Sequence, residues 1–223
     1  MSESSRKLGA ILYPGFEMLD YFGPLEMFSV LGSSEIEIMT VAETAGAVAA
    51  AIGSEGATGP SVVATYSFET APELDMLLIP GGMGTLAELE NTAMLDFLRT
   101  RSETAELVAT VCTGSALLAK TGVLDGHRAT SNKQVFALAT LQSDQVAWEE
   151  KARWVEDGKF FTSSGVSAGM DMALAIISKL FGEEQALMAA SYTEYTWHRD
   201  ADDDPFADEL NLLAKELGMV AVE

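Results

Sequence analysis

The sequence predicts an α/β fold built on a largely parallel sheet, and two features of the chain indicate it. Short apolar runs typical of buried strands alternate with longer segments whose apolar residues recur at helical spacing. Such alternation is typical of parallel strands with helices on both faces of the sheet. The chain has 223 residues, 48% of them hydrophobic, which suits one domain with a sizeable core.

The predicted strands are apolar runs that end at turn residues or at the start of a helix. They cover Leu8–Tyr13, Ile36–Val41, Val62–Phe68, Asp75–Pro80 and Leu107–Val111. The segment Arg153–Ser163 predicts a hairpin, because Asp157-Gly158 favours a tight turn between strands. The Gly- and Ala-rich stretch that follows Val41 predicts loop and edge structure.

The predicted helices show apolar residues at helical spacing. They cover Met18–Leu31, about Thr85–Arg101, Thr113–Gly122, the later part of Gly165–Phe181, and about Glu183–Trp197. Pro24 is expected to restart the first of them after an irregular turn, because proline removes a helical hydrogen bond. Gly122 is a typical helix end.

The charge of the chain argues against nucleic acid and membrane as partners. Thirty-four acidic and 13 basic residues give a formal net charge of −21, which repels phosphate backbones and anionic lipid. The sequence holds no uncharged apolar run of the roughly 18 residues that a membrane span needs. A single cysteine allows no internal disulfide and fits a reducing cytoplasm.

The acidic segment Asp200–Phe206 is expected to be a solvated turn. It lacks the glycine and the terminal glutamate of a calcium-binding loop, so no metal site is predicted there.

The chemistry of the sequence concentrates at Cys112. A buried strand runs directly into this residue, and a helix begins at once with Thr113-Gly114-Ser115. This order resembles a nucleophile elbow, in which small neighbours allow a tight, strained turn. The helix N-terminus is expected to favour thiolate over thiol. The alternative is an inert, buried cysteine.

Two further segments are expected at the same edge of the sheet. Gly81 and Gly82 end a strand, and their amides could bind developing negative charge; alternatively they form only a turn. Asp20 follows the first strand among apolar residues, where partial desolvation would raise its pKa and keep a proton available. A helix-capping role for Asp20 is equally open.

Four ordered motifs carry a resemblance to a known family: LDYFGP, IPGGMG, VCTGSALLAKTGVLDGHRAT and FFTSSGVSAGMDMAL. Together they resemble the ThiJ/PfpI superfamily and, within it, most closely the isocyanide hydratase group. The resemblance implies a flavodoxin-like three-layer sandwich, a homodimer and no cofactor. It spans a core of about residues 8–206, with a C-terminal helix at about 208–217 completing a single domain over 1–223.

The resemblance also implies which residues form the site. Its nucleophile corresponds to Cys112 and its acid to Asp20. Its remaining site positions are the oxyanion-side glycines, the small polar residue after the nucleophile and the loop over the thiolate, which correspond to Gly81, Gly82, Thr113 and Ser164-Gly165-Val166.

The chain departs from the family in two places. Thr113 stands where the amidase- and protease-like branch has His, and His127 and His198 are both expected at the surface, so a Cys–His hydrolytic pair lacks a base. Ser131-Asn132-Lys133 replaces the THW sequence common in the hydratase group, in a region expected close to the pocket.

These residues fit a cofactor-free hydratase that acts on a small electrophilic substrate. Cys112 would attack an isocyanide to give a thioimidate, and Asp20 would donate a proton and then activate water, releasing an N-substituted formamide. Two alternatives stay open: a glyoxalase- or deglycase-like enzyme acting on small carbonyls, and a non-enzymatic protein that senses oxidation through Cys112. A DNA-binding regulator is disfavoured by the charge.

Overall fold

A seven-stranded sheet forms the centre of the computed structural model, which describes residues 5–53, 56–216 and 218. The strand order is β10-β11-β7-β6-β1-β2-β5, and every neighbouring pair is parallel except β10–β11. The strands are β1 (Arg6–Ile11), β2 (Ile36–Ala42), β5 (Tyr66–Ser67), β6 (Met76–Ile79), β7 (Leu107–Val111), β10 (Trp154–Asp157) and β11 (Phe160–Ser163). The predicted parallel sheet is confirmed.

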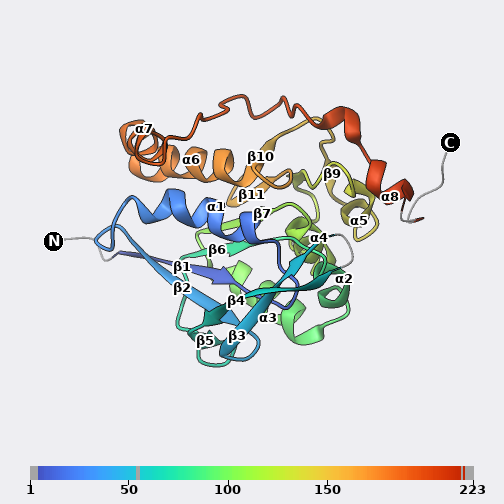
Figure 1. The fold of residues 1–223 in the computed structure, drawn as a ribbon, viewed down its shortest axis with the longest axis horizontal. Helices are drawn as coiled ribbons and strands as arrows, with labels where there is room; N and C mark the ends of the chain where they lie inside the picture. Colours follow the sequence, from blue (N-terminus) through green and yellow to red (C-terminus); the bar gives the residue numbers. More distant parts are fainter. Residues whose placement is uncertain (1–4, 54–55, 217, 219–223) are drawn as a thin grey trace.

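Helices cover both faces of this sheet (Figure 1). They are α1 (Met18–Ser29), α2 (Thr85–Glu88), α3 (Thr92–Thr104), α4 (Gly114–Lys120), α5 (Phe136–Thr140), α6 (Ala168–Phe181), α7 (Glu183–Tyr192) and α8 (Leu212–Glu216). The crossover through α1 moves one way across the sheet, and those through α3 and α4 move the other way. Because such crossovers are right-handed, α1 and the packed α6 lie opposite α3 and α4, as expected of a three-layer sandwich.

Helix α1 differs from its prediction, and tertiary contacts explain the difference. It runs without a break through Pro24, where a restart was expected. The Pro24 ring packs against α6, where a Cβ on Gly169 would lie 3.1 Å from its Cγ atom. One lost helical hydrogen bond is therefore offset by close packing between α1 and α6.

The helix predicted over Thr85–Arg101 is instead two helices, α2 and α3. Asn91 separates them, because its Oδ1 accepts hydrogen bonds from the amides of Ala93 (3.0 Å) and Met94 (3.3 Å). An Asn that caps a new helix in this way ends the preceding one. Likewise, α7 ends at Tyr192, short of the predicted Trp197.

The Gly- and Ala-rich stretch after β2 forms a strand hairpin of its own, which the sequence predicted only as loop and edge structure. Its strands are β3 (Gly46–Ile52) and β4 (Ala57–Ala64), paired antiparallel with an irregularity between Ala49 and Ala51. A short parallel pair, β8 (Arg128–Ala129) with β9 (Ala147–Trp148), lies outside the main sheet. The hairpin predicted over Arg153–Ser163 is confirmed as β10–β11.

At the C-terminal side, the helix predicted over residues 208–217 is shorter. A 3-10 turn over Ala207–Glu209 precedes α8, and Leu217 lies outside the described residues. No helix in the described part of the chain is long and apolar enough to cross a membrane.

The fold brings several loops to one edge of the sheet. The carboxyl ends of the parallel strands β1, β6, β7 and β11 lie at one edge of the sheet. Between β1 and β6, the direction in which successive strands are added to the sheet reverses. Crevices at such a reversal are where open α/β sheets bind ligands. The first turn of α1, which carries Asp20, therefore converges with the segments that carry Gly81, Cys112 and Ser164.

The packing of α4 on β6 generates a stability prediction. A Cβ on Gly114 would lie 2.4 Å from the carbonyl oxygen of Ile79 and 2.8 Å from that of Pro80. We expect Gly114→Ala to lower the free energy of unfolding by about 2–3 kcal/mol, because overpacking against backbone oxygens outweighs the better helix propensity of Ala. Urea unfolding measures this.

The matched control is Gly158→Ala in the β10–β11 turn. Gly158 has φ 63° but no heavy atom within 4 Å of its Cβ position, so only backbone strain of about 1 kcal/mol applies. Equal losses in the two variants would show that contact with β6 does not constrain residue 114.

Candidate active site

Cys112 occupies a strained elbow between β7 and α4. Its φ is 58°, in the left-handed region that side chains rarely adopt. The backbone is clamped on both sides: its amide donates to the carbonyls of Ser163 (3.2 Å) and Ser164 (3.3 Å). Its own carbonyl accepts from the hydroxyls of Ser115 (3.1 Å) and Ser131 (3.2 Å). These four bonds hold the strained conformation that the sequence predicted.

The sulfur of Cys112 receives a hydrogen bond that the sequence did not reveal. Asn132 Nδ2 donates to Sγ at 3.1 Å, while Asn132 Oδ1 accepts from the amide of Val135 at 3.2 Å. The second bond fixes which end of the side-chain amide faces the sulfur. In the sequence, Asn132 stood out only as a departure from the family motif, and no local pattern signals a donor to a distant thiol.

Gly165 lies directly against this pair. A Cβ at this position would be 2.1 Å from Asn132 Nδ2 and 3.1 Å from Cys112 Sγ. Only glycine leaves room for the contact, so the predicted loop Ser164-Gly165-Val166 does pack over the sulfur.

Asp20 is fully buried and adjoins the same thiol. Its Oδ2 accepts the amide of Gly81 at 2.9 Å, and an interaction with the Cys112 side chain influences the pKa of both groups. Asp20 Oδ1 is buried and makes no hydrogen bond within the described residues. Hydrogen bonds of a general acid are often completed only when substrate binds.

Burial controls the protonation of this pair. It raises the pKa of Asp20 well above its ordinary value, although the Gly81 amide opposes the shift. Burial also raises the pKa of the Cys112 thiol, followed by repulsion from Asp20, while the Thr113 amide and Asn132 lower it. The sequence predicted the opposite direction for Cys112, which is wrong because the helix-terminus argument omitted desolvation; α4 has only seven residues.

The oxyanion role predicted for Gly81 and Gly82 does not fit the structure, because both amides are already bound. Gly81 donates to Asp20, and Gly82 donates to Thr113 Oγ1 at 3.1 Å. A Cβ on Gly82 would lie 2.4 Å from the carbonyl oxygen of Gly15, so these glycines serve the close approach of loops. They hold the acid and Thr113 in place.

The hydroxyl of Thr113 belongs to a chain of buried hydrogen bonds. Tyr13 donates to the Pro80 carbonyl (2.8 Å), which leaves its oxygen to accept from Thr85 (3.0 Å). Thr85 in turn accepts from Thr113 (2.8 Å), whose oxygen accepts from Gly82. With its proton committed to Thr85, the Thr113 hydroxyl orients the elbow, and its backbone amide faces the sulfur.

A cavity of about 230 Å³ opens on Cys112. Its apolar walls come from several separate loops and helices, namely Met83, Leu86, Val135, Leu138, Val166 and Leu213. A second cavity of about 320 Å³ lies across Asn132 and Val166 and includes Lys133 and Phe206. In the described ranges, no group of three or more His, Cys, Asp or Glu side chains could hold a metal ion.

Both histidines make their contacts away from this cavity. His127 Nδ1 lies 3.3 Å from Asp157 Oδ2 beside the β10–β11 turn. His198 Nε2 lies 3.0 Å from the carbonyl oxygen of Asp203. Neither lines the Cys112 cavity, so the structure offers no Cys–His pair.

The acidic segment Asp200–Phe206 is not the fully solvated turn that was predicted. Asp204 is 2% exposed, and its carboxylate lies 3.4 Å from Arg153 Nη1 and 3.9 Å from Lys133 Nζ. The sequence could not indicate this, because both partners are distant along the chain.

The raised pKa of Asp20 predicts a pH-dependent stability difference. Above the ordinary pKa of a carboxyl, the unfolded chain releases this proton while the folded protein keeps it, so stability falls as pH rises. Asn has no such proton but still accepts from Gly81. We therefore expect the melting temperature of Asp20→Asn, relative to the unmodified protein, to increase from about pH 5.5 to about pH 8. A difference that shrinks over this range would mean that the pKa is not raised.

Comparison with known proteins agrees with this architecture. The model of the DJ-1/PfpI family matches residues 6–179. Isonitrile hydratase of Pseudomonas putida is 33% identical over 192 residues, which cover 85% of this chain and 78% of that protein. The transcriptional regulator GbdR of Pseudomonas aeruginosa is 28% identical over 135 residues, 60% of this chain but 36% of the regulator. The crystal structure of a ThiJ/PfpI family protein from Pseudomonas syringae has a TM-score of 0.78 and 29% identity, covering 99% of this chain and 88% of that one. The chain therefore belongs to the DJ-1/PfpI family.

Proposed function

We propose that this protein is a cysteine-dependent isocyanide hydratase that converts R–N≡C to the N-substituted formamide without a cofactor. One observation carries the proposal: the Cys112 sulfur accepts a hydrogen bond from Asn132 at an apolar cavity, and a buried acid with a raised pKa, Asp20, is near enough to influence the thiol. The similarity to isonitrile hydratase of Pseudomonas putida supports the same reaction.

The walls of the cavity favour an uncharged substrate. Burying an apolar substituent against Met83, Leu86 and Leu138 is favourable, whereas an anionic group would lose its hydration and meet the Glu17 carboxylate in the same lining. We propose that R is a small alkyl or aryl group.

The reaction needs one nucleophile and one acid. Cys112, as thiolate, attacks the terminal carbon, and Asp20 delivers its proton to that carbon, giving R–N=CH–S–Cys112. Asp20, now a carboxylate, takes a proton from water as the hydroxyl adds to the carbon, and then passes it to nitrogen. In the last step the new hydroxyl returns a proton to Asp20, the C–S bond breaks, and R–NH–CHO leaves with the thiolate and the acid restored.

The electrostatics of the site suit this cycle. Burial raises the pKa of the Cys112 thiol, so forming the thiolate is the costly step; the Thr113 amide and Asn132 lower that pKa, and Asp20 does not repel the thiolate while it keeps its proton. Burial makes Asp20 a weak acid, which lets it both donate and accept near neutral pH.

We further propose that the protein acts as a single domain, as a cytoplasmic homodimer and on small molecules. The net charge of −21 opposes binding to phosphate backbones. Leu19 and Phe22 of α1 are about half exposed and are apolar side chains that a second copy would cover.

The activity itself is tested with an aryl isocyanide, by following formamide production by absorbance. We expect turnover by the unmodified protein, none by Cys112→Ala, and a rate about 10²–10⁴-fold lower for Asp20→Asn, since proton transfer is lost while the fold is kept. Circular dichroism checks folding. Turnover of methylglyoxal but not of an isocyanide would overturn the proposal in favour of a glyoxalase-like enzyme.

The positions of the histidines give an independent prediction. A double variant, His127→Gln with His198→Gln, is expected to hydrate isocyanide within a few-fold of the unmodified rate, because neither ring lines the cavity. Parallel assays with amide and peptide substrates serve as the contrast. Amide hydrolysis that is lost with either histidine would assign the protein to the hydrolase branch.

A further inference from the structure

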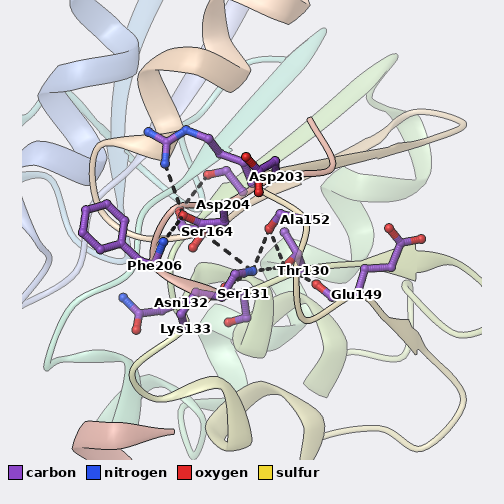
Figure 2. A network of polar contacts seen from close by, with 12 residues as sticks. Thr130, Ser131, Asn132, Lys133, Glu149, Ala152, Ser164, Asp203, Asp204 and Phe206 are labelled. Atoms are coloured by element: carbon purple, nitrogen blue, oxygen red, sulfur yellow. Dashed lines mark hydrogen bonds and ion pairs between the residues drawn. The ribbon is translucent and has the colours of Figure 1, made fainter. Parts of the chain in front are cut away.

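Lys133, the residue next to Asn132, has a fully buried charged side chain. Only 1% of it is exposed. Its Nζ donates to Thr130 Oγ1 and to the carbonyl of Ala152, both at 2.7 Å (Figure 2). Burial lowers the pKa of Lys133 to about 8, and the carboxylates of Asp204 and Glu150 oppose that shift. Lys133 therefore still carries a proton at neutral pH.

Asp204 supplies the charge that balances Lys133. Its carboxylate is fully buried, and Oδ2, 3.9 Å from Lys133 Nζ, has no hydrogen-bond partner. Arg153 also faces Asp204, but its guanidinium already binds Asp171 at 2.6 Å. Two buried cations thus meet two buried anions, and removal of either anion leaves one positive charge uncompensated.

The same loop holds Asn132 against the sulfur. The side chain of Lys133 enters the charged network while that of Asn132 reaches Cys112, so one turn of the backbone is anchored from both sides. The C-terminal segment adds two more bonds: the Asn211 amide donates to the Lys133 carbonyl (2.8 Å), and the Ala214 amide to that of Gln134 (2.9 Å).

We infer that Lys133 and Asp204 are positioning residues, and that their buried ion pair keeps the Asn132 amide within hydrogen-bonding distance of Cys112 Sγ. The C-terminal segment from Asp204 to Ala214 then helps to position the active-site residues. The inference deepens the proposed function and rests on it only in taking Cys112 as the reactive group.

The sign of one measurement separates this role from a direct electrostatic effect. Replacing Asp204 by Asn removes a negative charge, and through space that change alone lowers the pKa of a nearby thiol. If Asn132 instead moves away from the sulfur, the thiolate loses a donor and the pKa rises. Asp204→Asn is therefore more informative than a change at Lys133, where both effects raise the pKa.

The test is the pH dependence of alkylation of Cys112 by iodoacetamide, which needs no turnover and is unambiguous because the chain has one cysteine. Asn132→Ala is expected to raise the thiol pKa by about one unit, a roughly tenfold loss of thiolate at fixed pH. Asp204→Asn is expected to raise it in the same direction. Combined with Asn132→Ala, it should cause no further rise, because the donor is already gone.

Asp171→Asn is the matched control. It removes the other buried carboxylate of the network, which pairs with Arg153 and has no contact with Lys133. We expect a lower melting temperature and a thiol pKa that is unchanged or lower, because only the loss of charge acts on the sulfur. If Asp204→Asn does not fold, Thr130→Val removes an acceptor of Lys133 without changing charge and is expected to raise the pKa likewise.

An unchanged or lowered thiol pKa in Asp204→Asn, or in Thr130→Val if that variant replaces it, would overturn the inference. So would a rise that persists on the Asn132→Ala background. Failure of the proposed function has a different signature: no isocyanide is hydrated, yet the alkylation profiles shift as described.

Discussion

Two titratable side chains, Asp20 and Cys112, are buried close together at the edge of the sheet, and burial makes it costly for both to be charged at once. One proton must therefore stay with the pair. The groups around it serve this constraint. The Gly81 amide stabilises the carboxylate when it forms, and the Thr113 amide and Asn132 stabilise the thiolate when it forms.

This arrangement requires loops to approach one another closely, and glycine occupies the positions where any side chain would collide. Gly82 touches the loop after β1, and Gly165 touches both Asn132 and the sulfur. The left-handed conformation of Cys112 adds strain, which hydrogen bonds from Ser115 and Ser131 and to Ser163 and Ser164 hold in place. These backbone contacts fix the elbow and the approach of the loops around it.

Charged side chains influence the site indirectly, through residues that lie next to it. Arg153, Asp171, Lys133 and Asp204 form a buried and balanced network whose contribution to stability is small, because desolvation cancels much of the attraction. Its value lies in geometry, since buried charges tolerate few arrangements. Through Lys133, this geometry reaches the loop that presents Asn132 to the sulfur.

The alternation of strands and helices in the main sheet, the elbow at Cys112 and an acid, Asp20, at the same edge were predicted from the sequence, whereas the β3–β4 hairpin and the division of α2 from α3 were not. The predicted features depend on local patterns: apolar periodicity, a nucleophile between a strand and a helix, and an acid set among apolar residues. The family motifs identified the loop of Ser164, Gly165 and Val166 in the same way.

The protonation state of Cys112, the occupation of the Gly81 and Gly82 amides, and the parts played by Asn132 and Asp204 were decided only in the tertiary structure. Desolvation depends on every atom packed around a group, and a hydrogen bond depends on distances between residues far apart in the chain. No local pattern encodes either quantity. The sequence therefore determined which reactive groups are present. The packing of the loops determined which of these groups keep their protons and which hydrogen bonds each group makes.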